Sequence, residues 1–263
     1  MKKLSYLLVL SGLISVPAIA ADAPASPHTV TANVGVTTDY IFRGISQTQH
    51  KPALSGGVDY SHSSGLYAGT WLSNQGWVAT GGTNALNDGG YKSNSSLEVD
   101  LYGGYKGNLA DFGYDVGLIT YYYPGDRSGA PAGYATPDTT EVYLAASWKM
   151  LTLKYSHAIS DYFIGWGTDP TTKTKGSNYL ELNASHDLGG GWGLTGHVGH
   201  QKIKNIGASD YTDWKLGVTK DVGFGTVTLA YSDTDADPVA GSYMWDGKDV
   251  SKGVFALSFA KTF

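Results

Sequence analysis

The sequence predicts an all-β protein: a transmembrane antiparallel up-and-down β-barrel of about twelve strands, preceded by a cleaved signal peptide. Three observations predict it. Apolar and polar residues alternate with a period of two, long and short turn-rich segments follow each other in regular succession, and the final segment ends on Phe263. Successive side chains of a strand point to opposite faces, and a tilted strand of about ten residues crosses a bilayer.

The first twenty residues have the features of a secretory signal. Lys2 and Lys3 precede an apolar run over residues 4–16, and Ala18-Ile19-Ala20 supplies the small residues of a cleavage site. The run is shorter than the roughly 20 residues that a spanning helix needs. We therefore expect cleavage after Ala20 and export from the cytoplasm.

This assignment divides the chain into a signal peptide (residues 1–20), a short linker (21–28) and a barrel (29–263). No other segment is long and apolar enough for a membrane helix. A mature chain that spans a membrane must then be a closed barrel, because only a barrel satisfies every strand backbone group in lipid. The expected location is the bacterial outer membrane.

Composition agrees with a barrel. Hydrophobic residues make up 41% of the chain and charged residues 16%, with 36 Gly, 19 Tyr, 7 Trp and no Cys. Without Lys2 and Lys3 the chain has 16 basic and 23 acidic residues, a net charge near −7. An acidic chain argues against nucleic acid as a partner.

Turn-rich segments alternate between short and long along the whole chain. This is typical of tight periplasmic turns and longer extracellular loops, and it requires an even strand count, with ten or fourteen as the rivals to twelve. The expected short turns are residues 63–65, 107–111, 149–150, 188–191 and 221–225, and the expected long segments are 44–52, 75–94, 124–139, 161–177, 203–209 and 233–252.

The strands themselves predict an apolar outer face. In residues 29–43 the apolar parity runs from Val30 to Phe42, while Asp39 and Arg43 lie opposite. A soluble barrel would carry its charges outside, whereas here the charged parity has to face inward. In residues 66–73 the face stays open, because Tyr67 and Trp71 compete with Leu66 and Leu72. Aromatic residues expected in interfacial girdles are Tyr40, Phe42, Tyr105, Phe112, Tyr122, Trp148 and Trp192.

The last strand places Phe255, Leu257, Phe259 and Phe263 on one face, with Lys261 as a charged exception near the end. It resembles the closing strand of bacterial outer-membrane barrels, which typically ends on Phe. The resemblance implies that Phe263 is the assembly signal read by the barrel-assembly machinery.

Residues 39–47, reading DYIFRGISQ, carry a resemblance to a known family. Together with GGVDYSHSSGLYAGTWLSN over residues 56–74, the strand at residues 98–105 and the closing strand, this motif is similar to the TorF family of Gram-negative porins. The resemblance covers essentially the mature chain. It implies a β-barrel porin without a named substrate and without catalytic residues.

About twelve strands predict a narrow pore for passive diffusion of small hydrophilic solutes. The inward charges show an acidic excess, which favours cations unless the charges only pair with one another to brace the wall. Both interpretations stay open. The candidate pore-lining residues are Asp39, Arg43, Glu98, Asp100, Asp115, Glu141, Lys154, Glu181, Asp213 and Lys215.

Arg43 is one of two arginines in the chain. It is either a constriction residue that binds anionic solute groups or a structural fork that holds a loop to the wall. With Asp39 some four residues earlier on the same predicted strand, any salt bridge of Arg43 must be to another strand.

Two alternatives to a channel remain. One is a structural or adhesive barrel that acts through its extracellular loops. The other is an outer-membrane lipid hydrolase, since His157, His186 and His200 lie on the lipid-facing parity, but no nucleophile motif accompanies them. The expected partners are outer-membrane lipids and lipopolysaccharide. We expect no enzyme activity, no cofactor and no dedicated metal site, although Asp233, Asp235 and Asp237 have the spacing that opens a calcium loop.

Overall fold

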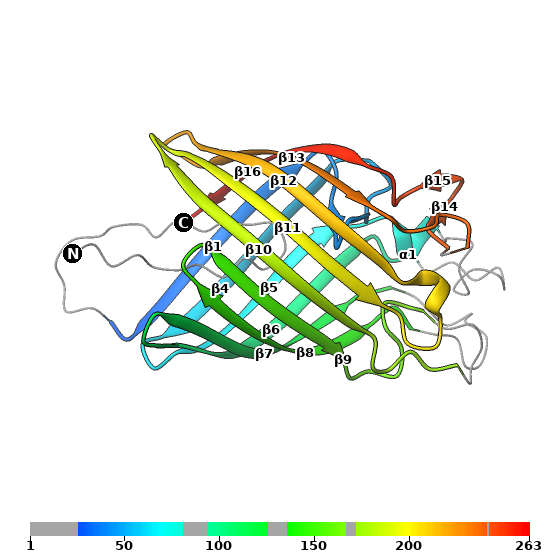
Figure 1. Cartoon of the computed structure of the whole chain (residues 1–263), viewed down its shortest axis with the longest axis horizontal. Coiled ribbons are helices and arrows are strands. Elements are labelled where there is room, and N and C mark those ends of the chain that lie inside the picture. Colours follow the sequence, from blue (N-terminus) through cyan, green and yellow to red (C-terminus); the bar gives the residue numbers. More distant parts are fainter. Residues whose placement is uncertain (1–25, 81–93, 126–135, 167–171, 241) are drawn as a thin grey trace.

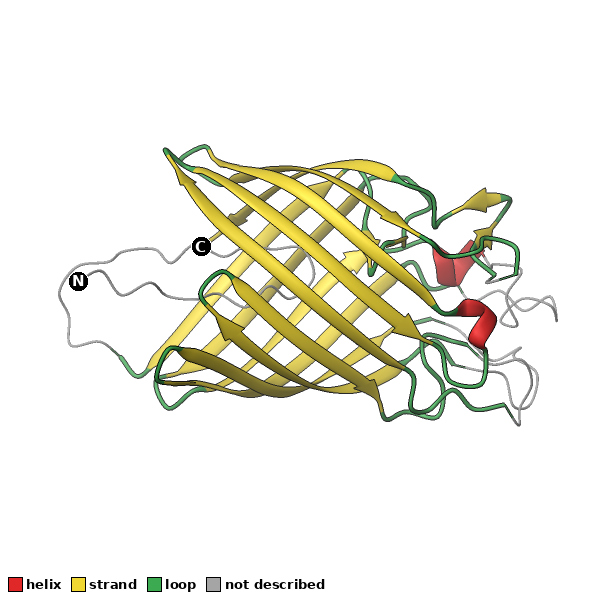
Figure 2. Ribbon diagram, in the orientation of Figure 1, coloured by secondary structure: helices red, strands yellow, loops and turns green. Residues whose placement is uncertain are grey.

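The structure is a computed structural model that describes residues 26–80, 94–125, 136–166, 172–240 and 242–263. Twelve strands form a closed antiparallel barrel, tilted against its long axis (Figure 2). The predicted fold class is confirmed, and the predicted signal peptide lies outside the described residues. The barrel strands are β1 (His28–Thr37), β4 (Ala53–His62), β5 (Leu66–Asn74), β6 (Leu97–Leu109), β7 (Phe112–Tyr122), β8 (Thr139–Trp148), β9 (Leu151–Ala158), β10 (Asn178–Gly189), β11 (Trp192–Lys202), β12 (Tyr211–Asp221), β13 (Thr226–Thr234) and β16 (Val254–Thr262).

Each strand pairs with its neighbour in the chain, and β16 returns to β1 to close the wall. The closing register aligns Asn33 with Thr262 and Val36 with Phe259. Beyond the last paired residue, Phe263 exchanges two backbone hydrogen bonds with Ala32, of 2.8 and 3.2 Å. No strand edge is left open in the wall, which is the condition for spanning lipid.

The connectors separate by length, as predicted. Short turns lie at the end of the barrel where β1 begins and where the C-terminus lies, and the long connectors gather at the other end (Figure 1). The long connectors contain two small hairpins, β2–β3 (Ile41–Phe42 with Ile45–Ser46) and β14–β15 (Met244–Trp245 with Lys248–Asp249), and two short helices, α1 (Trp77–Thr80) and the 3-10 turn η1 (Gly207–Ser209). In the part of the chain that the structure describes, neither helix has the length and apolar character needed to cross a bilayer.

The outer wall is apolar. Most large apolar side chains that are exposed lie on the barrel strands, including Leu101, Leu144, Leu216 and Phe255 at half or more of their surface. A continuous exposed apolar belt of this kind fits lipid rather than water. Of the expected girdle, the outward aromatics are Tyr105, Phe112, Tyr122, Trp148 and Trp192.

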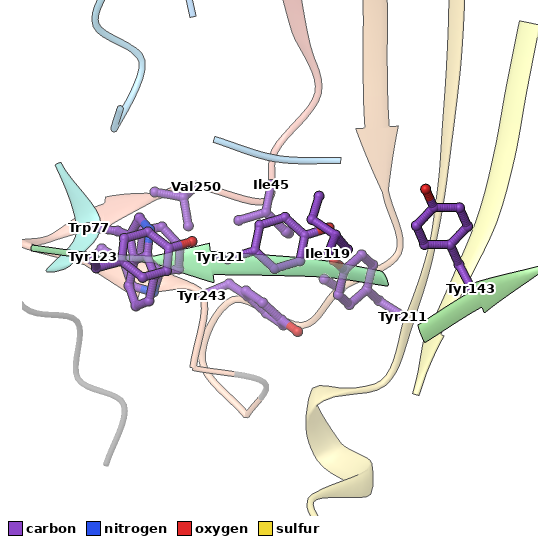
Figure 3. Packing of buried hydrophobic residues seen from close by; sticks show 11 residues of the cluster. Ile45, Trp77, Ile119, Tyr121, Tyr123, Tyr143, Tyr211, Tyr243 and Val250 are labelled. Atoms are coloured by element: carbon purple, nitrogen blue, oxygen red, sulfur yellow. The ribbon is translucent and has the colours of Figure 1, made fainter. Parts of the chain in front are cut away.

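The barrel has an aromatic core inside its long-connector end. The core is built from inward wall residues such as Ile119, Tyr121 and Tyr143 together with connector residues such as Trp77 and Tyr243 (Figure 3). Ile119 interrupts the polar alternation of its strand because it contributes to this core. The aromatic rings fill the cross-section where the long connectors fold inward.

The first strand is shorter than predicted, and two girdle assignments are wrong. It ends at Thr37, after which the chain turns into the barrel. Tyr40 is 6% exposed and Phe42 packs against the aromatic core, so neither side chain faces lipid. The structure also shows which residues of β5 face the lumen. Tyr67 and Trp71 point inward, while Leu66 is exposed on the outer wall.

Candidate functional site

Residues 38–52, here called the plug segment, connect β1 to β4 and fold into the lumen (Figure 1). The chain leaves the wall where Thr38 bonds to β16, its amide donating to Leu257 O at 3.0 Å and its hydroxyl accepting from the Leu257 amide at 3.0 Å. The β2–β3 hairpin then turns back on itself inside the barrel. Most of the plug segment is buried, although it contains no apolar run.

Asp39 organises the plug segment. Its Oδ1 accepts hydrogen bonds from Ser46 Oγ at 2.6 Å and Thr48 Oγ1 at 3.1 Å, and its Oδ2 lies 2.7 Å from His50 Nδ1. The carboxylate is 4% exposed, so these partners replace the water it lost. His50 Nε2 continues to Asp249 O at 2.8 Å, which joins the plug segment to the β14–β15 hairpin.

Arg43 extends from the tip of the β2–β3 hairpin to the far wall. Its Nη1 and Nη2 bond Glu141 Oε1 and Oε2 at 3.1 and 2.6 Å, and Nη1 also bonds Gln201 Oε1 at 2.8 Å. The guanidinium stacks over the Tyr179 ring at 4.4 Å. Its fork thus contacts β8, β10 and β11. The guanidinium group is thus occupied by a protein carboxylate and an amide oxygen, contacts that hold the plug segment to the wall.

Three further residues of the DYIFRGISQ motif fit the same arrangement. Tyr40 donates to Glu98 Oε1 at 2.6 Å, and the Phe42 ring meets Tyr121 edge-on at 5.5 Å. Gly44 has φ +78, and a Cβ there would strike Asp213 and Thr234 of the wall. The hairpin tip consequently approaches the β12–β13 wall more closely than any side chain would permit.

The predicted acidic residues are inward, and nearly all already have donors. Tyr67 donates to Asp115 at 2.6 Å, Tyr179 donates to Asp213 at 2.7 Å, and Tyr102 makes a similar bond to Asp59. Glu181 accepts from Asn183 at 2.7 Å. Asp100 is the exception, because its Oδ1 is buried without a hydrogen-bond partner. Most of these carboxylates thus accept a hydrogen bond from a tyrosine of another strand.

A cavity occupies the lumen toward the short-turn end. Its volume is about 190 Å³, it is partly open to solvent, and it runs from Met150 at a short turn to Tyr40 of the plug segment. Small hydroxyl residues make up much of its wall, including Thr195, Thr228 and Ser258. The predicted bases Lys154 and Lys215 also line it, as does Asp39, whereas Glu98 does not.

His197 is a lumen residue that sequence reasoning missed. Its Nε2 lies 2.9 Å from Asp213 Oδ2 and 2.8 Å from the Tyr179 hydroxyl, and its Nδ1 lies 2.7 Å from Asn183 Oδ1. Gln201, which accepts a hydrogen bond from Arg43, was also missed. Both residues lie on the polar parity of β11, but their partners come from other strands and from the plug segment, which only the fold shows.

Phe263 and the candidate calcium loop complete the predicted sites. The Phe263 side chain is exposed on the outer wall, at the seam between β1 and β16.

Asp235 and Asp237 accept backbone hydrogen bonds from Thr212 and Val239, at 2.6 and 2.9 Å. Their spacing is therefore that of turn-forming aspartates. Within the described ranges no cluster of three metal-ligating side chains occurs.

The apolar belt, the closed twelve-stranded wall and the polar lumen define a membrane β-barrel of the outer-membrane type. The chain belongs to the family described as "Bacterial protein of unknown function (Gcw_chp)", whose model matches residues 21–263. The TorF resemblance of the 39–47 motif stays a prediction, because the matching model bears a different name. No curated protein matches the sequence.

Solved structures show the same fold. The KdgM porin is similar with a TM-score of 0.52 and 7% identity, covering 89% of this chain and 99% of its own. A second structure, "KdgM porin in complex with disordered oligogalacturonate", gives 0.51 and 8% with the same coverage. The NanC porin gives a TM-score of 0.50 and 11% identity, again over 89% and 99%. At such identities the likeness concerns the fold alone.

Proposed function

We propose that the protein is an outer-membrane channel for small hydrophilic solutes, held closed by its plug segment. The cavity behind the plug segment supports a solute path, since a barrel that only anchors loops has no need of a lumen cavity lined by serine and threonine hydroxyls. The printed names of the similar structures are also those of porins. The long connectors then face the cell exterior and the cavity faces the periplasm.

The single observation that carries the closed state is the Arg43–Glu141 pair. Glu141 is fully buried and Arg43 nearly so, and the pair joins the plug segment to β8 of the wall. Removing one member of such a pair leaves the other charged and unpaired, a cost of about 3–5 kcal/mol. Movement of the hairpin and hydration of the lumen relieve that cost, so loss of the pair favours opening.

The expected cation preference has no support in this arrangement. It rested on an acidic excess along the inner wall, but the carboxylates accept hydrogen bonds from tyrosines, from Arg43 and from Asn183. The alternative interpretation, in which these charges brace the wall, agrees better with the contacts. A carboxylate that is engaged in this way attracts mobile cations less than a free one.

A barrel that acts only through its loops is the second candidate, and the packed aromatic core in the long-connector end favours it. Conductance separates the two. A loop-displaying barrel stays closed whatever happens to Arg43, whereas a plugged channel opens when the plug segment is released. We infer that the plug segment opens the channel when it is released, because its contacts through Asp39 and Arg43 are polar and water can replace them.

Planar-bilayer recording of the refolded chain tests the proposal. Wild type should show rare openings, and Arg43→Met and Glu141→Gln should each raise the open probability or the conductance. Asp161→Asn is the matched control, since it breaks the exposed ion pair to Lys173 at 2.8 Å instead of a buried one. If Arg43→Met and Glu141→Gln both fold but neither conducts more than wild type, the lumen is not a solute path.

A further inference from the structure

Lys154 and Lys215 have an unusual position for lysines inside a barrel. Lys154 lies on β9 and Lys215 on β12, and both line a cavity of about 70 Å³ that Arg43 also lines. This cavity shares both lysines with the larger one toward the short-turn end. Between them on the inner wall stand β10 and β11, which carry Asn183 and His197.

Neither ammonium group has an acceptor in the described part of the chain. Lys154 Nζ lies 4.5 Å from the centre of the Tyr143 ring, a contact that leaves its donors free, and no hydrogen bond or ion pair joins Lys215 to any described residue. A lysine ammonium has three donors, and enclosure in a lumen makes unfilled donors costly. Two such groups that line one cavity call for an acceptor.

The carboxylates of the same cavity attract the lysines electrostatically, Glu181 both of them and Asp213 Lys215, but their hydrogen bonds go to other side chains. Glu181 Oε2 accepts from Asn183 and lies 3.6 Å from His197 Nδ1. Asp213 accepts from Tyr179 and His197 with one oxygen each. The two carboxylates thus have hydrogen-bond donors, while the two lysines lack hydrogen-bond acceptors. A ligand of this cavity must therefore supply acceptor atoms.

We propose that Lys154 and Lys215 form a binding site for the carboxylate or phosphate group of an anionic solute. Anionic oxygens accept charge-assisted hydrogen bonds from both ammonium groups. The Ser232 hydroxyl lines the same cavity and adds a neutral donor. Glu181 and Asp213 repel the bound anion, so the affinity is weak, as a solute that must leave the channel again requires.

The site deepens the proposed channel function and rests on it for its purpose, but it is tested without conduction. Calorimetric titration of the folded full-length chain in detergent, with acetate and with inorganic phosphate at low ionic strength, measures binding directly. Wild type should bind at least one of the two anions. Tighter binding of phosphate identifies a phosphate-bearing solute, and tighter or equal binding of acetate identifies a carboxylate.

Substitutions locate the site. Lys154→Met and Lys215→Met should each weaken binding about tenfold or more, since each removes charge-assisted hydrogen bonds. Lys220→Met should bind as wild type does, because Lys220 is directed over the Trp192 ring on the outer wall. Lys154→Gln and Lys215→Gln provide a second pair of variants if the Met substitutions prevent folding.

No binding of either anion to wild type, or undiminished binding after both lysines are replaced, overturns the site. Equal loss in Lys220→Met overturns it as well, because the anion would then be attracted by overall charge. A protein that binds anions but never conducts contradicts the channel and leaves the site standing. A protein that conducts after release of the plug segment but binds no anion contradicts the anion site and supports the channel.

Discussion

Arg43 binds Glu141 across the lumen with two hydrogen bonds of 2.6 and 3.1 Å, although 98 positions separate them in the sequence. The pair joins the tip of the β2–β3 hairpin to β8. In the order of the wall, β8 is the fifth strand from β1, after which the hairpin follows in the chain. Its position explains why a short polar segment can fill a barrel. The hairpin is anchored at its base by Asp39 and at its tip by Arg43, and the aromatic core covers it from the long-connector end.

Gly44 should control how closely the hairpin tip sits against the wall. Gly44→Ala adds a Cβ that strikes Asp213 and Thr234, so we expect a loss of about 1–3 kcal/mol of unfolding free energy from overpacking and more frequent channel openings. Gly247→Ala is the matched control. Gly247 also has a positive φ, +71, but a Cβ there meets nothing within 4 Å. Equal effects of the two substitutions would indicate backbone strain alone.

Tyr40 should contribute to stability through its hydroxyl. Tyr40→Phe removes the donor to Glu98, which is 2% exposed, and we expect a loss of about 1–3 kcal/mol because a buried carboxylate loses a partner. Urea unfolding in detergent measures the change. Tyr60→Phe serves for comparison, since the Tyr60 hydroxyl bonds His28 at an exposed site. The account is contradicted if Tyr60→Phe costs as much as Tyr40→Phe.

The outer face should reject charge in proportion to depth. Leu101→Arg and Leu182→Arg place a guanidinium on the exposed apolar belt, and each should cost about 2–4 kcal/mol if the residue lies near the bilayer midplane. Unfolding in lipid vesicles gives the value. Val239→Arg, in the exposed connector between β13 and β16, should change little. If neither strand substitution changes the free energy of unfolding, the assignment of the outer and inner faces is wrong.

The sequence was a good guide to the wall because the wall is a repeated pattern. Alternation with period two identified the strands, and the spacing of turn-rich segments led to the correct count of twelve. The same alternation was misleading after Thr37, where Tyr40 and Phe42 continue the apolar parity of β1. A residue facing lipid and a residue facing an aromatic core look alike in the sequence. Only the left-handed φ of Arg43, +46, and of Gly44 marks the reversal of the chain, and a φ angle is not visible in the sequence.

The charged residues of the lumen were found, but their partners were not. Polar parity placed Asp115, Glu141 and Asp213 inside, where the structure has them. Their donors are Tyr67, Arg43 and Tyr179, which lie on other strands or in the plug segment. Such contacts depend on barrel closure and register, which no local pattern contains. For this reason an acidic excess counted along the sequence overstated the charge that a solute would meet.

A charge exchange between Arg43 and Glu141 tests the central claim most directly. Arg43→Glu places two carboxylates together, and Glu141→Arg places two guanidinium groups together, so each single variant should conduct far more than wild type in planar bilayers. The double variant restores an opposite-charge pair, and the coupling between the two changes isolates the contribution of the pair. We expect the double variant to return substantially toward the closed state. Single variants that stay closed, or a double variant as open as the sum of its parts, would contradict a channel held shut by this pair.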